Sequence, residues 1–232
     1  IIDADVAVIT SVDIDHQVFL GNDRETIGFE KAGIMRANQH IVIGDPDAPK
    51  SVLNHATKVN DIDSSSVQEQ AFNKIKVRNK NFIIKKKSSI DNQKAQSWQW
   101  QCFESMTDGK ETEFCLKSLT STHIPQDNVA TALMVLKQLG VVLTTAKVNA
   151  LIEQTKVAGR TELFKRNDFK ASNFNEFKVQ NQCDVMLDVG HNPHAGRYLA
   201  QKLKQFKFQK QYQRIVAVVA MLADKDISNT LV

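Results

Sequence analysis

A strand end, a loop and a helix start follow one another in Leu187-Asp188-Val189-Gly190-His191-Asn192-Pro193-His194. The apolar run Asp184–Val189 predicts a strand, and Pro193–Phe206 predicts a helix, because proline suits the first helical turn and glycine allows an unusual backbone before it. The carboxyl end of a strand is where open α/β sheets bind ligands. The sequence therefore predicts an α/β unit with a ligand site in this loop.

The same alternation of strands and helices is expected toward both ends of the chain. Asp5–Thr10 and Ile41–Ile43 are short apolar runs that suit buried parallel strands, and Thr26–Met35 and Pro49–Val59 suit helices. Arg214–Leu222 is a strong apolar strand candidate after the predicted Pro193–Phe206 helix. The fold class is therefore α/β, and its last part is expected in strand–helix–strand order.

Residues 61–124 differ in character, because short β-like pieces there are separated by Ser, Asn, Asp and Gly. We expect an antiparallel excursion. Trp98 and Trp100 alternate with polar neighbours, which favours edge-strand packing, and stacking on a nucleic-acid base is the alternative. The expected strands are Asn81–Ile84, Trp98–Phe103 and Glu113–Leu119.

Two amphipathic helices are expected after this excursion, over Pro125–Leu139 and Thr145–Thr155. Val157–Arg160 contains a glycine between small or charged residues and suits a hinge. We therefore expect two domains, residues 1–156 and residues 157–232.

Composition limits the classes of function. The chain has 232 residues, a formal net charge of +4 and only three cysteines, with no Cys-x-x-Cys pair. Its lysine runs suit solvated faces, without the aromatic-interleaved stripe of a nucleic-acid binder. No apolar run approaches the roughly 20 residues of a membrane span. We expect a cytoplasmic protein that binds neither nucleic acid nor membrane. Because the sequence does not start with Met, we expect it to be a fragment of a longer protein.

The loop at Asp188 offers chemistry at a strand end. Asp188 can accept hydrogen bonds from a ribose, and His191 can donate to a phosphate or transfer a proton. The alternative is structural, with Asn192 capping the helix and both histidines on the surface. Local physics leaves the two interpretations equal.

Further polar residues stand at other element ends. Asp13, Asp15 and His16 follow the first strand, where they can hold a divalent cation or simply cap a turn and pack. Lys31 is either a surface ion-pair partner of Glu30 or a lysine that reacts with carbon dioxide to give a carbamate.

Two more candidates are Asn128 and Arg160. Asn128 stands in the first turn of the long helix and suits a cap. Arg160 follows Gly159 at the expected hinge, where a guanidinium suits phosphate recognition or a solvated linker equally well.

Taken in order, these segments resemble one family. The strand ending in Thr-Ser is followed by DxDH, by DRETIGFEKAGIMR (residues 23–36), by a helix bearing Asn128, by Gly159-Arg160, by LDVGHNPHA (187–195) and by VAMLADKD (219–226). The order is similar to the folylpolyglutamate synthase/dihydrofolate synthase branch of the Mur ligases. EKAGIMR and LDVGHNPHA are the specific motifs, and residues 61–124 match least.

The resemblance implies an incomplete Mur-ligase-type central domain over residues 1–156 and a Rossmann-like C-terminal α/β domain over residues 157–232. It implies a monomeric ligase that uses ATP and two magnesium ions. The implied substrates are L-glutamate and dihydropteroate or tetrahydrofolate polyglutamates, joined through an acyl phosphate.

It also implies roles for single residues. His16 matches a magnesium ligand, and Lys31 matches a carbamylated lysine that helps to hold the second magnesium. ATP contacts are implied for Asn128, Arg160, Asp188 and His191. Lys31 and His191 are expected to act in catalysis, and closure of the second domain is expected to assemble the site.

The sequence also departs from the family pattern. It contains no G-x-x-x-x-G-K-[ST] phosphate loop, and its last domain is expected to be short. The chain alone is therefore expected to be inactive. The alternatives are a related ligase with another carboxylate substrate, such as a cell-wall Mur ligase or a cyanophycin-type synthetase, and a non-catalytic nucleotide-binding or interaction remnant.

Overall fold

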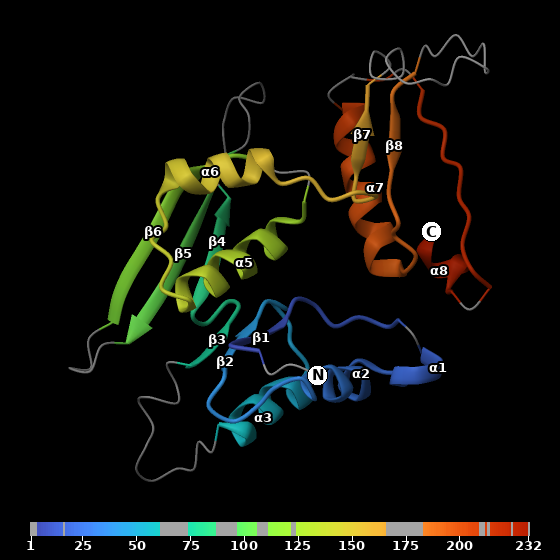
Figure 1. The fold of residues 1–232 in the computed structure, drawn as a ribbon. Helices are drawn as coiled ribbons and strands as arrows, with labels where there is room; N and C mark the ends of the chain where they lie inside the picture. Colours follow the sequence, from blue (N-terminus) through green and yellow to red (C-terminus); the bar gives the residue numbers. More distant parts are fainter. Residues whose placement is uncertain are drawn as a thin grey trace. The chain divides into compact units, whose positions relative to one another are not determined.

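A computed structural model gives the fold in Figure 1 and describes most of the chain. It divides into two compact units, Ile1–Thr155 and Lys156–Val232, beside the boundary expected at residue 157. The described residues are 4–15, 17–60, 74–86, 97–105, 111–121, 124–165, 183–208, 212, 214–223 and 225–231.

A three-stranded parallel sheet forms the first layer of the first unit. Its strands are β1 (Val6–Ile9), β2 (His40–Ile43) and β3 (Ile75–Val77), in the order β1-β2-β3. The pairs run from Val6 with His40 to Ile9 with Ile43, so the carboxyl ends of β1 and β2 are level. Ile41, Val42 and Ile43 are fully buried, as expected for parallel strands covered on both faces.

Helices pack on this sheet and on one another. They are α1 (Gln17–Leu20), α2 (Arg24–Ala32) and α3 (Lys50–Val59). Asp23 caps α2, because its side chain accepts from the Thr26 backbone N–H. Gly28 lets α2 approach α3 closely, since a Cβ there would lie 2.9 Å from Ser51 Oγ and 3.0 Å from a Val52 methyl. Ile27, Ala32, Val52 and Ala56 complete this core.

An antiparallel sheet follows, and the expected excursion begins later than residue 61, since β3 belongs to the parallel sheet. Its strands are β4 (Phe82–Lys86), β5 (Trp98–Ser105) and β6 (Glu111–Leu119), in the order β4-β5-β6. Trp98 and Trp100 lie on the central strand and are 1% and 0% exposed. The expectation of edge-strand packing was therefore wrong, because β5 pairs with β4 on one side and β6 on the other, and a helical layer covers the face that carries the tryptophans.

The covering helices are α5 (Gln126–Gln138) and α6 (Thr145–Gln154), which lie beside the antiparallel sheet in Figure 1. The Trp100 indole N–H donates to the Ala130 carbonyl of α5 at 3.1 Å. Helix α5 also contacts β2, where Gly44 follows the strand. A Cβ on Gly44 would lie 2.1 Å from Thr131 Oγ1, so this helix sits directly against the end of the parallel sheet.

The second unit contains β7 (Glu162–Phe164), β8 (Val185–Leu187), α7 (Pro193–Phe208) and α8 (Ile227–Thr230). β7 and β8 are antiparallel, with Leu163 opposite Met186. Gly190 keeps the loop after β8 close to α7, since a Cβ there would lie 2.7 Å from the Ala195 methyl.

Arg214–Leu222 forms neither a strand nor a helix within its described residues, and the expected strand–helix–strand order was wrong. Its side chains are exposed apart from half-buried Met221, with Val216 68% and Val218 96% accessible. An apolar, β-branched run becomes a strand only where a neighbouring strand offers its N–H and C=O groups. Among the described residues β8 takes its partner from β7.

The helices of the described residues were also searched for a membrane span. None of them is both long enough and apolar enough to cross a bilayer.

Candidate functional site

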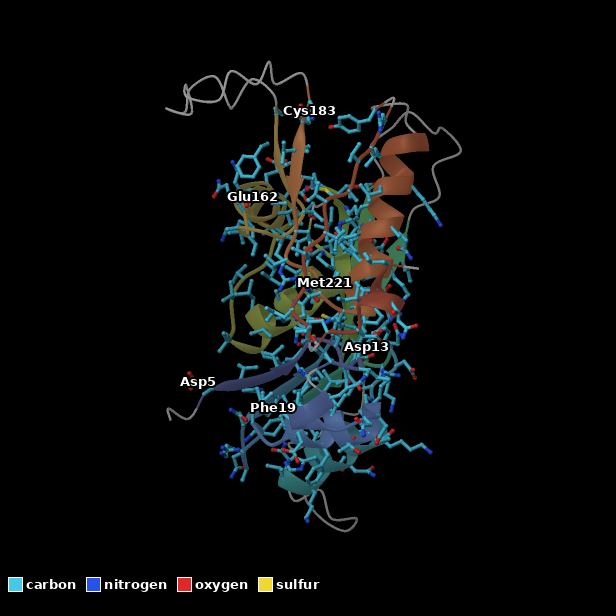
Figure 2. The ribbon with its side chains drawn as sticks, turned by 90° about the vertical axis from the view of Figure 1, so that its right-hand side faces the viewer. Asp5, Asp13, Phe19, Glu162, Cys183 and Met221 are labelled. Carbon is cyan, nitrogen blue, oxygen red and sulfur yellow. The ribbon has the colours of Figure 1, made fainter. Side chains whose placement is uncertain are left out.

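The expected site residues of the first unit follow the carboxyl end of β1. Asp13 and Asp15 are half-buried there, and the Asp13 carboxylate accepts the Ile14 backbone N–H at 2.8 Å. Asp13 is labelled in Figure 2, as is Phe19 of α1, whose side chain is 81% exposed. His16, the expected magnesium ligand, lies outside the described residues.

Val12, directly before this acidic loop, is held from two sides. Its N–H donates to Asp45 Oδ2 at 2.8 Å, and its carbonyl accepts from Arg24 Nε at 2.9 Å. Asp45 stands after the carboxyl end of β2, and its side chain is only 6% exposed. Arg24 also approaches Asp45 at 3.3 Å. The two members of one ion pair therefore bind the N–H and the carbonyl of the same residue, Val12.

This Arg24–Asp45 pair was missed in the sequence. The signal for Asp45 was present, because it follows an apolar strand just as Asp13 does, and polar residues at adjacent parallel strand ends meet at one edge. Arg24 carries no such signal. A charge-dense helix start looks the same whether its arginine is solvated or inserted between two strand ends.

Lys31 lies in the last turn of α2 and is half-buried. Positions 24, 28 and 31 fall on one face of an α-helix, because residues three, four and seven apart share a face. Arg24 at the first position contacts the strand-end loop, and Lys31 lies about 10 Å farther along the axis at 1.5 Å per residue. Lys31 therefore shares a helix face with the residue that touches the acidic loop.

Asn128 does not cap α5, which corrects the expectation for this residue. The helix begins at Gln126, its cap position is Pro125 without a side-chain cap, and Asn128 is an exposed residue in the first turn. This turn is anchored from the sheet, since Arg78 after β3 forms an ion pair with Asp127 at 3.0 Å. Together with Thr131 against Gly44, the contact places Asn128 at the carboxyl edge of the parallel sheet.

In the second unit, Asp188 ties two loops together. Its Oδ1 accepts the Gly190 N–H and its Oδ2 accepts the Thr161 N–H, both at 2.7 Å. The Val189 N–H in turn donates to the Gly159 carbonyl at 2.8 Å. The glycine–arginine segment around Arg160 is therefore fastened to the loop after β8.

His191 and Asn192 follow Asp188 in the loop before α7. Asn192 caps α7, because its side chain accepts the Ala195 N–H at 2.9 Å, as the structural alternative expected. His191 Nδ1 lies 2.9 Å from the Val189 carbonyl. A carbonyl can only accept, so this contact makes Nδ1 the protonated nitrogen and gives Nε2 the acceptor role in the neutral ring.

Tyr198 of α7 is a further polar residue near this loop that the sequence did not single out. Burial, with a smaller contribution from the charge of Asp188, raises the pKa of the Tyr198 phenol to about 12. The phenol therefore stays protonated at neutral pH. An aromatic residue at this position of an amphipathic helix is common, so nothing in the sequence distinguished Tyr198.

The structure thus brings the expected residues together in two groups. Within the first unit, the loop after β1, the N-terminal turn of α2 and the first turn of α5 gather at the carboxyl edge of the parallel sheet, and Lys31 lies in the last turn of α2. Within the second unit, Arg160, Asp188 and His191 share one pair of hydrogen-bonded loops. No group of three or more His, Cys, Asp or Glu side chains positioned to hold a metal occurs among the described residues.

Comparison with known proteins gives matches along nearly the whole chain. No model of a known protein family matches. The dihydrofolate synthase/folylpolyglutamate synthase of Haemophilus influenzae is 33% identical over 227 residues, which are 97% of this chain and 45% of that protein. The E. coli dihydrofolate synthase/folylpolyglutamate synthase is 29% identical over 231 residues, 100% of this chain and 44% of that protein.

Solved structures agree with these relatives. E. coli FolC in complex with DHPP and ADP matches with a TM-score of 0.70 and 30% identity, over 99% of this chain and 44% of that one. A bifunctional folylpolyglutamate synthase/dihydrofolate synthase with Mn, AMPPNP and L-glutamate bound matches with a TM-score of 0.70 and 33% identity, over 99% and 45%.

The chain spans less than half the length of the relatives that it matches, and the alignment includes both of its units. Over the stretch that it shares with them, the chain is similar in sequence and in structure to the dihydrofolate synthases/folylpolyglutamate synthases.

Proposed function

We propose that the protein containing this stretch uses ATP to ligate L-glutamate to dihydropteroate, to folylpolyglutamates or to both. The observation that supports it most is the 33% identity to a dihydrofolate synthase/folylpolyglutamate synthase over 97% of the chain. One such enzyme structure carries AMPPNP, Mn and L-glutamate, and another carries ADP and DHPP.

The proposed reaction proceeds in two displacements. The acceptor carboxylate attacks the γ-phosphorus of ATP, forming an acyl phosphate and releasing ADP. The glutamate amine then attacks the acyl carbon, an amide bond forms, a proton leaves the nitrogen and inorganic phosphate departs. Both steps concentrate negative charge on phosphoryl oxygens, so positioning and cationic groups do most of the catalysis.

The first unit supplies the residues proposed near the phosphates. His16 is proposed as a magnesium ligand, and Lys31, as its carbamate, as a ligand of a second ion. Asn128 is proposed to contact ATP. Support for His16 and Asn128 comes from the sheet edge, since the acidic loop and the first turn of α5 lie there, and Arg24 connects the loop to the helix that carries Lys31.

Magnesium fits these donors. It prefers oxygen ligands, and it needs only one or two protein ligands where phosphate oxygens and water complete the shell. Half-buried Asp13 and Asp15 add hard oxygen donors in the same loop. When bound, the ion would neutralise phosphate charge.

The second unit supplies Arg160, Asp188 and His191 toward ATP. Each Asp188 oxygen already accepts one backbone N–H, which fixes the carboxylate and leaves further lone pairs for a ribose hydroxyl. His191 is oriented through Nδ1, so its Nε2 is the atom proposed to meet a phosphate or a proton in transfer.

We further propose that residues 1–156 are part of a Mur-ligase-type central domain and that residues 157–232 are part of a Rossmann-like C-terminal domain. Closure at the Val157–Arg160 hinge would assemble the site and exclude water. The hydrogen bonds of Gly159 and Thr161 with the Asp188 loop support the movement of Arg160 together with that loop.

A chimeric enzyme tests this proposal. The 227 matching residues of the H. influenzae relative are replaced by this chain, and amide formation from ATP, glutamate and dihydropteroate is measured by mass spectrometry. Ligation is expected, and it should be lost in the His16→Ala and Asp188→Ala versions. A folded chimera that ligates glutamate to neither dihydropteroate nor tetrahydrofolate polyglutamates contradicts the proposal.

The 232-residue chain alone is expected to form no product in the same assay, because its sequence contains no phosphate loop. Any ATP-dependent product formed by the purified chain would show this expectation to be wrong. A contaminating host enzyme is excluded by repeating the measurement with the Asp188→Ala chain.

A further inference from the structure

The Arg24–Asp45 pair joins three elements of the first unit at the edge where the metal ligands are proposed. We propose that Arg24 and Asp45 are positioning residues, which fix the loop carrying Asp13, Asp15 and His16 through the peptide groups of Val12. The inference rests on the proposed function for the part that concerns the metal. Neither side chain is itself proposed to touch metal or substrate.

Asp45 provides the fixed end of this arrangement. Its Oδ2 accepts from the Val12 N–H at 2.8 Å and its Oδ1 accepts from the Asp47 N–H at 2.9 Å. A carboxylate that is only 6% exposed needs such donors and a cation, because burial of an unpaired charge is costly. The Asp45 carboxylate therefore holds the ends of β1 and β2 in one relative position.

Arg24 closes the arrangement from the helix side. Its Nε donates to the Val12 carbonyl at 2.9 Å. Its Nη2 donates to the Asp47 carbonyl at 2.6 Å and to the Asp45 carboxylate at 3.3 Å. Its Nη1 donates to the Asp47 carboxylate at 2.9 Å. These contacts use all three guanidinium nitrogens at once. An ammonium group has a single nitrogen and cannot reproduce them.

The consequence for the loop is geometric. Both polar groups of the Val12 backbone are engaged, and its side chain is 2% exposed, so the chain leaves the sheet from a fixed point. Asp13 and Asp15 follow within three residues of Val12, so fixing Val12 limits the positions that their carboxylates can take. The same arginine ties this point to the helix of Lys31.

The test uses the full 232-residue chain and four variants. Arg24→Gln and Asp45→Asn remove the ion pair. Arg24→Lys keeps the positive charge but lacks the three guanidinium nitrogens. Glu25→Gln is the control. Glu25 adjoins Arg24, but its carboxylate accepts from the N-terminal N–H groups of α3, at Lys50 and Ser51, and not from the loop. Circular dichroism first establishes that each variant is folded.

Two readouts separate positioning from general stability. Amide hydrogen exchange of peptides covering residues 11–16 reports on loop order, and peptides covering β2 serve as the internal reference. Water-proton relaxation with Mn²⁺ alone reports on metal binding, with His16→Ala as the loss-of-ligand variant. We expect faster exchange at residues 11–16 and about tenfold weaker Mn²⁺ binding in Arg24→Gln, as for residues that orient metal ligands.

Arg24→Lys should resemble Arg24→Gln in both readouts, and Glu25→Gln should match the unsubstituted chain in both. Unchanged exchange at residues 11–16 in Arg24→Gln and Asp45→Asn overturns the inference. So does faster exchange that spreads equally through β2, because it shows a general structural role. Where Arg24→Gln does not fold, Arg24→Lys and Asp45→Asn decide by the same criteria.

The proposed metal site can fail separately. If the unsubstituted chain binds no Mn²⁺, or if His16→Ala binds it equally well, the proposed role of His16 is wrong. The exchange measurement still decides whether Arg24 and Asp45 hold the loop. If His16→Ala loses Mn²⁺ binding while Arg24→Gln keeps it, the metal site stands and the positioning inference falls.

Discussion

Three consecutive residues before and within the first turn of α2 contact three different parts of the first unit. Asp23 caps its own helix, Arg24 holds the loop after β1, and Glu25 accepts from the backbone N–H groups of Lys50 and Ser51 at the start of α3. From the sequence, this segment was considered as part of a family motif and for Lys31, and no role was assigned to Asp23, Arg24 or Glu25. Alternating charges at a helix start have the same pattern whether they are solvated or bonded to distant backbone.

Glu25 predicts a specific acid dependence of stability. Hydrogen bonds from the Ser51 and Lys50 N–H groups, which favour its charged form, hold its pKa below the ordinary value of 4.5. A carboxyl whose pKa is lowered by folding contributes stability above pH 4.5, and this contribution is lost as pH falls through the lower folded value. The Tm of Glu25→Gln should therefore fall less than that of the unsubstituted chain on acidification.

The measurement is Tm by circular dichroism from neutral pH downward. Ser51→Ala is the comparison variant, because it removes the Ser51 hydroxyl, which contributes least of the three hydrogen-bond donors to the lowered pKa of Glu25, but keeps both N–H donors to the Glu25 carboxylate. Ser51→Ala should therefore keep most of the acid dependence of the unsubstituted chain. An equal Tm decrease in Glu25→Gln would show that these bonds do not couple to folding.

The contact between α5 and the end of β2 depends on Gly44, which has no side chain. A Cβ on Gly44 would lie 2.1 Å from Thr131 Oγ1 and 2.9 Å from its methyl group. Real Cβ atoms do not approach so closely, so the helix or the strand end must move. The position of α5, and with it that of Asn128, is therefore set by Gly44.

Gly44→Ala should lower the free energy of unfolding by about 1–3 kcal/mol, the usual cost of overpacking. Thr131→Ala in the same chain should recover part of this loss, because it removes the two nearest atoms. Urea unfolding followed by tryptophan fluorescence gives all four corners of the double-mutant cycle. A coupling free energy near zero would contradict the close contact.

Among the elements, the Trp98–Phe103 stretch and the Arg214–Leu222 stretch show where sequence reasoning succeeds and fails. The first was expected as a strand and is one, but only the packing of α5 shows that its tryptophans face the core. The second has the stronger strand composition and forms none in its described residues. Apolar, β-branched composition makes a strand possible, and a neighbouring ladder makes it form.

The two units of the molecule differ in their cores. Among the described residues, every apolar side chain that is buried lies in Ile1–Thr155, and in Lys156–Val232 the buried side chains are Thr161 and Thr230. Burial of apolar surface is the main driving force of folding. The first unit should therefore fold without the second.

Residues 1–155 expressed alone should unfold cooperatively, with a Tm within a few degrees of the transition that tryptophan fluorescence reports in the full chain. Both tryptophans, Trp98 and Trp100, lie in this unit, so they report on it alone. Residues 156–232 alone should show no cooperative transition by circular dichroism. A shortened chain 1–155 that lacks a transition would show that the units depend on each other.

Sequence alone determined the α/β class, most helices and strands of the first unit, and the resemblance that the relatives confirmed, because periodicity and ordered motifs are local properties of the chain. The folded chain was needed to show that Arg24 and Asp45 enclose Val12, that Asp188 ties two loops, and that Arg214–Leu222 forms no strand. These outcomes depend on which backbone groups meet across long stretches of chain. Hydrogen-bond partners so far apart leave no periodic trace in a single sequence.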